Sequence, residues 1–253
     1  MNSALRRLSA AVMLLFGLLL LNANYLQVVK ANDLHNNSRN PRLIAEEYSR
    51  ERGQIIVGDQ PVAKSVATND RLKYRREYAQ GPLYAPATGF YSLVYGSSGI
   101  EQAANPILSG TDASLFVRRV IDTLTGEPPK GGSVILTLNP AAQKAAYDGL
   151  RKLRARGAVV AIDPTTGAIL ALVSTPSYDP NLLASHDPAE IRKNYDRLDG
   201  LKARPMLNRA LRQTYPPGST FKIVTTAAAL ESGRFRPDSP VDNAAVLKLP
   251  QST

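Results

Sequence analysis

The stretch between Arg7 and Lys30 contains no charged residue, and it constrains the fold more than any other feature. Its 22 residues open with the strongly apolar run LSAAVMLLFGLLLL. A helix of about 20 apolar residues spans the hydrocarbon core of a bilayer. We therefore expect a transmembrane helix at residues 8–29, preceded by a short cytoplasmic tail at residues 1–7.

The flanks of this segment predict its orientation. Arg6 and Arg7 precede it, and the positive-inside rule places such a basic end in the cytoplasm. The bulk of the chain would then lie outside the plasma membrane. A cleaved signal peptide is the alternative, because the strongly apolar core is only about 14 residues long. No Ala-x-Ala cleavage site follows the core, which favours an uncleaved anchor, and both alternatives predict an exported protein.

Composition argues against several classes of function. The absence of cysteine excludes disulfides and thiolate metal sites. The two histidines, His35 and His186, are isolated in the sequence, so we expect surface positions for both and no metal site. The net charge of +10 is not concentrated in a long basic run, and the short cluster at residues 71–76 is typical of a solvated face. We therefore expect no cofactor and no nucleic-acid partner.

The rest of the chain mixes helical and strand patterns, which predicts an α+β fold with two regions. The first region covers residues 30–156. Its expected elements are, in order, a loop at 35–41, a short helix at 43–52, strands at 54–57 and 61–66, an irregular stretch at 81–99, an amphipathic helix at 113–124 and a strand at 133–138.

A strong helix start closes the first region. Asn139 is a favoured N-cap, and Pro140 suits the first helical position, where a backbone N–H has no partner to lose. We expect this helix to run to Arg156. Gly157 would end it, because glycine adopts the left-handed conformation of a helix stop without a steric cost.

The second region, residues 157–253, opens with a predicted β-hairpin. Its arms are residues 158–162 and 168–173, joined by a five-residue turn at 163–167. Both arms are apolar enough to predict burial on two faces. A loop-rich stretch follows, with short helices expected at 191–198 and 208–211, and leads to a helix that begins at Ser219.

Ser219 and Lys222 are the candidate catalytic residues. Side chains three apart share one face of a helix, so the two can meet. A serine hydroxyl needs a base to become a nucleophile, and a lysine serves when desolvation or neighbouring cations lower its pKa. The N-terminus of a helix also stabilises a developing oxyanion. The β-branched run at residues 223–226 is unfavourable in an exposed helix, so we expect this helix to be packed on most sides.

A Ser-x-x-Lys tetrad by itself is weak evidence, since about one match is expected by chance in a chain of this composition. The flanking sequence makes it specific: Pro216-Pro217-Gly218 leads into it, an apolar helix follows, and the apolar hairpin precedes it. The alternative is that Ser219 is only an N-cap and Lys222 is only a solvated surface residue.

These residues resemble the class B penicillin-binding proteins, and most closely their actinobacterial branch. The resemblance rests on segments spread along the chain, which are RGQI at 52–55, GIE at 99–101, GGSVILTLNPAAQ at 131–143, GAVVAIDPTTGAILALVSTPSYDPN at 157–181 and NRALRQTYPPGSTFKI at 208–223.

The resemblance implies a peptidoglycan D,D-transpeptidase that acts in cell-wall synthesis, cell division and cell shape. Residues 30–156 would form a pedestal or dimerisation domain, and residues 157–253 part of the penicillin-binding transpeptidase domain. Ser219 would form the acyl-enzyme and Lys222 would act as its general base. The implied partners are peptidoglycan stem peptides, β-lactams, the plasma membrane and divisome membrane proteins.

The sequence departs from this family in two respects. Residues 56–60, which follow RGQI, are IVGDQ and not the commoner acidic-basic turn. The second departure is downstream of the candidate serine. Neither a Ser-x-Asn nor a Lys-Thr/Ser-Gly motif follows Lys222. We therefore expect the sequence to be the N-terminal part of a longer protein, with weak or no activity alone. A penicillin-sensing or non-catalytic cell-wall scaffold and a serine β-lactamase remain alternatives. The long region before Gly157 disfavours the β-lactamase, which is usually compact.

Overall fold

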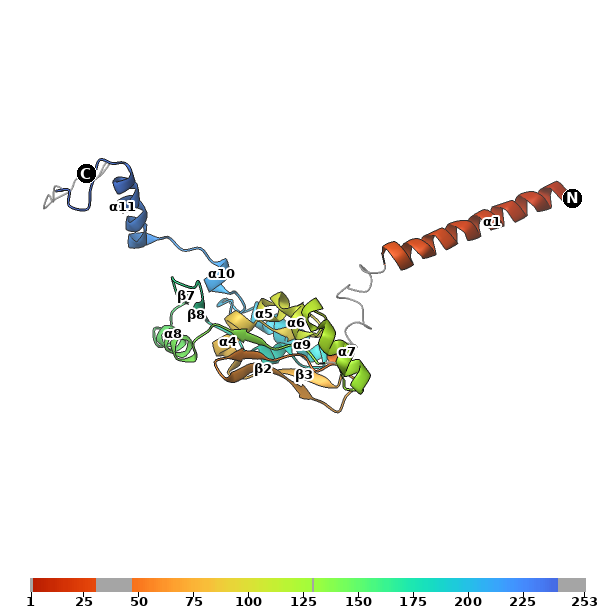
Figure 1. Ribbon diagram of the computed structural model, residues 1–253, viewed down its shortest axis with the longest axis horizontal. Helices are drawn as coiled ribbons and strands as arrows, with labels where there is room; N and C mark the ends of the chain where they lie inside the picture. Colours follow the sequence, from red (N-terminus) through yellow and green to blue (C-terminus); the bar gives the residue numbers. More distant parts are fainter. Residues whose placement is uncertain (1, 31–46, 129, 241–253) are drawn as a thin grey trace. The chain divides into compact units, whose positions relative to one another are not determined.

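The computed structural model describes residues 2–30, 47–128 and 130–240 (Figure 1). The chain divides into two compact units, Met1–Arg212 and Gln213–Thr253. The predicted loop at 35–41, and most of the first half of the helix predicted at 43–52, lie outside the described residues.

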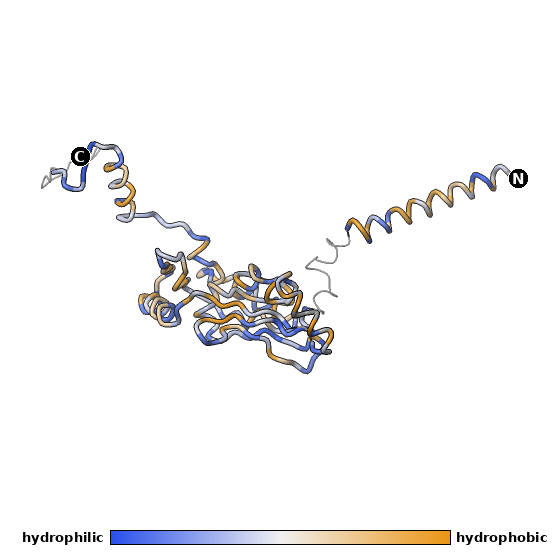
Figure 2. The backbone as a smooth tube through the Cα atoms, in the orientation of Figure 1, coloured by the Kyte–Doolittle hydropathy of each residue, from blue (hydrophilic) through white to orange (hydrophobic). Residues whose placement is uncertain are grey.

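The N-terminal segment is helical, as predicted. An α-helix, α1, covers Asn2–Asn24 and continues as a π-helical segment, η1, over Tyr25–Val29. Hydrophobic residues follow one another along α1 (Figure 2). The stretch Leu5–Val29 is long and apolar enough to cross a membrane. Because this criterion uses only length and composition, the membrane span stays a prediction.

The first unit contains a four-stranded sheet. Its strands are β1 (Ile55–Val57), β2 (Gln60–Ala67), β3 (Tyr74–Tyr78) and β6 (Val134–Leu136). They lie in the order β3-β2-β1-β6, with β1 antiparallel to β2 and parallel to β6. The strands predicted at 54–57, 61–66 and 133–138 are thereby confirmed.

The structure corrects the irregular stretch predicted at 81–99. A helix, α4, covers Gly81–Thr88, and a small hairpin follows from β4 (Tyr91–Ser92) and β5 (Gly96–Ser97). Proline suits the first turn of a helix, so Pro82 does not prevent α4 from starting. Burial then stabilises the helix, since Leu83, Tyr84 and Ala87 join the core against the sheet.

Short helices connect this hairpin to β6. They are α5 (Gly99–Ala103), α6 (Asn105–Leu108), a 3-10 turn η2 (Ala113–Leu115) and α7 (Phe116–Thr125). The helix predicted at 113–124 is therefore confirmed, with its first turn in 3-10 form.

Helix α8 (Pro140–Lys152) starts as predicted but ends earlier. The Asn139 side chain accepts hydrogen bonds from the backbone N–H groups of Ala141 and Ala142, each at 3.0 Å. The predicted end at Gly157 is wrong: Arg154 takes the left-handed conformation with φ 49°. Gly157 instead pairs with Thr175 as the first residue of the next strand.

The predicted hairpin is present as β7 (Gly157–Ile162) and β8 (Ile169–Thr175). The burial predicted for both arms holds only for β8, whose last five residues are buried. Val160 and Ile162 of β7 remain 43% and 56% exposed. Among the described residues, β7 pairs with β8 alone, so no strand pairs with the other edge of β7.

On the edge of β8 that does not pair with β7, a side chain satisfies the backbone of Leu172. Gln143, which is fully buried, accepts a hydrogen bond from the Leu172 N–H at 2.8 Å and donates one to the Leu172 carbonyl at 3.0 Å. Its amide also donates to the carbonyl of Leu83 at 2.9 Å. Gln143 thus stands where a third strand would pair and joins α8 to both β8 and α4.

Exposed apolar side chains on β7 predict self-association of this chain. Replacing Val160 and Ile162 together by lysine is expected to shift the detergent-solubilised chain toward monomer in sedimentation velocity, because charges on an exposed strand oppose edge-to-edge pairing. Glu127→Lys, at an exposed position outside the hairpin, raises the net charge by the same two units, so it is the matched control and should leave the distribution unchanged. An equal shift in both proteins would show that net charge, and not β7, controls association.

The remaining elements of the first unit follow β8. They are a 3-10 turn η3 (Pro180–Leu183), α9 (Pro188–Asp199) and α10 (Arg209–Arg212), and they confirm the short helices predicted at 191–198 and 208–211. Asn181, at η3, bonds to both the N–H and the carbonyl of Tyr78 at 2.9 Å. These two hydrogen bonds connect η3 to the end of β3. His186, between η3 and α9, is only 12% exposed because the β2–β3 turn folds over it. The surface position predicted for His186 is therefore wrong, and His35 lies outside the described residues.

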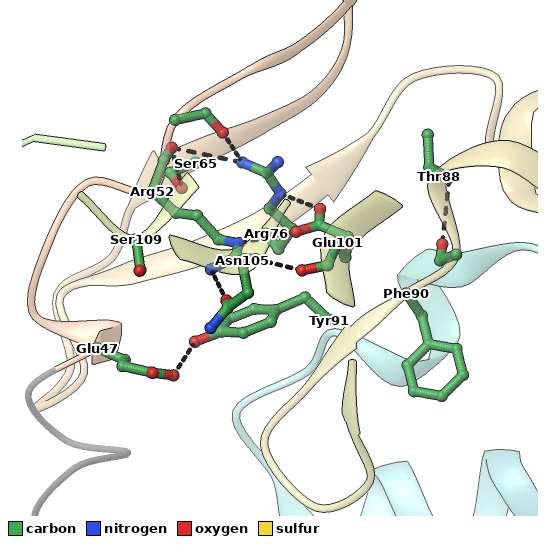
Figure 3. Close-up of polar contacts among 12 residues, drawn as sticks. Glu47, Arg52, Ser65, Arg76, Thr88, Phe90, Tyr91, Glu101, Asn105 and Ser109 are labelled. Atoms are coloured by element: carbon green, nitrogen blue, oxygen red, sulfur yellow. Dashed lines mark hydrogen bonds and ion pairs between the residues drawn. The ribbon is translucent and has the colours of Figure 1, made fainter. Parts of the chain in front are cut away.

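A buried charge cluster joins the sheet to α5 (Figure 3). Glu101 is fully buried, and its carboxylate accepts hydrogen bonds from Nε of Arg52 at 2.7 Å and from Nε of Arg76 at 2.6 Å. Arg52 also donates to Asn105 at 2.7 Å and lies 4.2 Å from the centre of the Tyr91 ring. Burial is the largest single effect and lowers the pKa of Arg52, but Glu101, Tyr91 and Tyr78 together outweigh it, so the net shift is upward. Two arginines thus share one carboxylate in the interior.

Candidate acyl-transfer site

The two candidate catalytic residues lie at a helix start in the second unit. Ser219 is the middle residue of a 3-10 turn, η4 (Gly218–Thr220). Lys222 is the second residue of α11 (Phe221–Glu231), which continues directly from that turn. The predicted helical start at Ser219 is confirmed to within one residue.

The residues before Ser219 explain the local geometry. Gly218 has φ 55°, a conformation that costs glycine little and other residues more. Pro217 fixes its own φ at −66°. The backbone N–H of Thr220 donates to the Pro217 carbonyl at 3.2 Å, and its hydroxyl donates to the same oxygen. The chain therefore turns sharply and enters the helix with Ser219 in its first turn.

The surroundings of this pair differ from the packed site that the sequence predicted. Ser219 and Lys222 are both exposed, and no hydrogen bond joins them among the described residues of this unit. Phe221, Ile223 and Val224 are 51%, 74% and 55% exposed. The two candidate residues thus lie three positions apart, but the described residues provide neither the desolvation nor the packing that a lysine base and a serine nucleophile would need.

Two other features of the described chain bear on site assignment. No group of three His, Asp or Glu side chains in the described residues could hold a metal ion. A cavity of about 530 Å³ is lined by residues that include Phe90, Tyr178 and Arg204. All the residues that line this cavity belong to the first unit.

Two family models match the chain. The model of the penicillin binding protein A dimerisation domain matches residues 52–134. The model of the penicillin binding protein transpeptidase domain matches residues 157–251, a range that includes Ser219 and Lys222. The chain belongs to the penicillin-binding protein family. The resemblance predicted from the sequence is therefore confirmed.

Relatives with assigned functions agree with this membership. The chain is 50% identical to the peptidoglycan D,D-transpeptidase PbpA of Mycobacterium tuberculosis, over 100% of this chain and 52% of that protein. It is 39% identical to the peptidoglycan D,D-transpeptidase MrdA of Escherichia coli over 54% of this chain and 22% of that protein. The chain thus spans about half the length of PbpA.

Solved structures of the family share the fold. The imipenem acyl-enzyme complex of penicillin-binding protein A from M. tuberculosis matches with a TM-score of 0.74 and 52% identity, over 76% of this chain and 45% of that chain. PBP2 of Pseudomonas aeruginosa matches with a TM-score of 0.63 and 29% identity, over 80% of this chain and 45% of that chain. The predicted α+β fold, with a dimerisation domain and part of a transpeptidase domain, is confirmed.

Proposed function

We propose that this chain carries the nucleophile-bearing part of a peptidoglycan D,D-transpeptidase. The observation that carries the proposal is the position of Ser219, three residues before Lys222 at a helix start inside the matched transpeptidase segment. Lys222 takes the proton of the Ser219 hydroxyl as Oγ attacks the penultimate carbonyl of a D-Ala-D-Ala stem. The terminal D-Ala leaves as the amine and carries that proton away. An amine of a neighbouring stem then displaces Ser219 and forms the cross-link.

The same chemistry makes β-lactams acylating inhibitors. The ring amide is attacked by Ser219, the C–N bond of the ring opens, and the ring nitrogen takes up the proton. The expelled nitrogen stays tethered to the acyl group and does not diffuse away, so the acyl-enzyme persists. The M. tuberculosis relative is known as acyl-enzyme complexes with imipenem, ceftriaxone and penicillin G, which supports this assignment.

The proposed function also assigns a location to the protein and a role to each of its regions. The helix at Leu5–Val29 would anchor the protein in the plasma membrane, with the basic N-terminal end in the cytoplasm and the rest outside. Residues 30–156 would form the pedestal that contacts divisome or other cell-wall synthesis proteins, and residues 157–253 the transpeptidase part. The match at residues 52–134 to a dimerisation domain supports the role of the pedestal.

Peptide mapping of a penicillin adduct tests this function. Membranes from cells that make the protein are treated with benzylpenicillin and digested with trypsin. The adduct is expected on the peptide of residues 213–222, QTYPPGSTFK, which contains a single serine. A long-lived adduct supports a transpeptidase. Rapid hydrolysis of penicillin with loss of the adduct would indicate a β-lactamase, and no adduct on this peptide would indicate a non-catalytic scaffold.

A further inference from the structure

Helix α7 exposes a row of apolar side chains to solvent. Val117, Ile121 and Leu124 are 68%, 53% and 82% exposed. Their spacing of four and then three residues places them on one face of the helix. Single apolar side chains at a surface are ordinary, whereas a contiguous row of them points to a binding surface. These three residues are called the α7 stripe.

The α7 stripe is not part of the interior of the first unit. None of its three residues belongs to the core clusters found in the described part of the chain. Burial in this unit therefore does not account for their apolar character. The stripe is available to a partner outside the unit.

The segment that carries α7 is attached close to the start of the first unit. After α7 the chain returns to Glu51, where the Gly131 N–H donates to the Glu51 carbonyl at 2.8 Å. Lys130 Nζ also lies 3.5 Å from the Glu51 carboxylate. Before α7, the N–H groups of Thr111 and Asp112 donate to the Pro106 carbonyl at 2.8 and 2.9 Å. Both ends of the segment are thus fixed to the body of the unit.

The position of Glu51 in the sequence limits its distance from the apolar helix. Glu51 follows the stretch Leu5–Val29 by roughly 20 residues, and that length of chain spans at most about 70 Å even when fully extended. Where Leu5–Val29 crosses a bilayer, the base of the α7 segment is held near the surface of the same bilayer. The local concentration of the stripe at that surface is correspondingly high.

A lipid surface suits the size and charge of the stripe better than a protein surface does. Stable protein–protein interfaces bury about 1,200–2,000 Å² in total, which is far more than three side chains supply. A short amphipathic helix binds a bilayer weakly by itself, but a second anchor in the same chain makes such a contact stable. The sequence of α7 contains two arginines and one aspartate, and a net positive charge favours anionic lipids.

We propose that the α7 stripe docks on the plasma membrane as a second attachment of the first unit. This inference rests on the membrane location assigned under the proposed function. Helix α7 lies in the plane of the interface, with Val117, Ile121 and Leu124 toward the acyl chains. The helix at Leu5–Val29 holds the protein in the membrane, and the stripe fixes the orientation of the first unit above it.

Fluorescent probes on single cysteines test the docking, since the chain has no cysteine of its own. Val117→Cys, Ile121→Cys and Leu124→Cys are each labelled with an environment-sensitive nitrobenzoxadiazole dye in the full chain. The labelled chain is reconstituted into phosphatidylcholine–phosphatidylglycerol vesicles. All three probes are expected to show blue-shifted emission and severalfold stronger quenching by nitroxide lipids than a probe at Leu153→Cys. Leu153 is the matched control, because it is a leucine of the first unit that is 75% exposed.

A probe at Leu15→Cys, inside the apolar helix, separates the two levels of the proposal. Quenching at Leu15 together with control-like signals from the α7 stripe would refute the docking and leave the membrane location intact. Absence of quenching at Leu15 would refute the location itself. A blue shift at the stripe without lipid quenching would show that a protein, such as a second copy of the chain, covers it, and would also overturn the docking.

Thiol reactivity gives a second readout. In vesicles, Leu124→Cys is expected to react with a membrane-impermeant maleimide severalfold more slowly than Leu153→Cys. Adding Ile121→Glu to Leu124→Cys should remove the difference, because a carboxylate in the stripe opposes insertion among acyl chains. Gln102→Glu adds the same charge at an exposed position of α5 and should leave the reaction slow. Equal rates for Leu124→Cys and Leu153→Cys would contradict the proposal.

Discussion

Replacement of Ser219 by alanine is expected to abolish penicillin acylation of the protein, with no adduct on the peptide of residues 213–222. The reason is that an acyl-enzyme requires a nucleophilic oxygen at this position, and alanine supplies none. Measurement is by fluorescent penicillin labelling of membranes, followed by gel detection and mass spectrometry of the peptide. The change removes one exposed hydroxyl, so the amount of folded protein should not fall.

A second serine of the same unit provides the control. Ser232 lies just after α11, and its hydroxyl bonds to the Ala229 carbonyl at 2.6 Å. Ser232→Ala should label as strongly as the wild-type protein. Labelling that survives Ser219→Ala would refute the assignment of the nucleophile.

Glu101→Gln is expected to destabilise the first unit by about 3–5 kcal/mol, the cost typical of removing one partner from a buried ion pair. The substitution keeps the shape of the side chain but leaves Arg52 and Arg76 without a counter-charge in the interior. Nη2 of Arg76 is already buried without a hydrogen-bond partner, so loss of the Glu101 charge would leave this guanidinium still less compensated. Urea unfolding of the detergent-solubilised chain, followed by tyrosine fluorescence and far-UV circular dichroism, measures the loss.

The control for this change is a carboxylate that is paired at the surface. Glu77 lies 3.6 Å from Lys64, and both side chains are nearly half exposed. Exposed pairs contribute about 0–1 kcal/mol, so Glu77→Gln should have little effect on the free energy of unfolding. Equal losses for Glu101→Gln and Glu77→Gln would contradict the view that burial of the charge determines its importance.

Local sequence signals predicted where elements start better than where they end. Asn139 and Pro140 fixed the start of α8, because a cap acts over two or three residues. The end depended on a distant partner: Gly157 pairs with Thr175, and Arg154 takes the left-handed position instead. For the same reason α4 was missed, since it is stabilised by core contacts that a window rich in Pro and Gly does not reveal.

The candidate site shows the same division between local and distant information. The spacing of Ser219 and Lys222, and the turn before them, follow from adjacent residues and were predictable. The buried cluster of Arg52, Arg76 and Glu101 was not, because its members come from separate elements and only the folded chain brings their charges together. The environment of Ser219 was predicted as packed, whereas the described residues leave α11 exposed.

The position of Gln143 has a consequence for dissecting this protein. Its side chain bonds to Leu172 in β8 and to Leu83 in α4, and it thereby connects two stretches that match separate family models. A fragment cut at Gly157 would lose α8, and Leu172 would then present an unpaired N–H and carbonyl. The hairpin would become a ribbon open on both sides, prone to aggregation. The boundary that suits a family description is thus a poor place to cut an expression fragment.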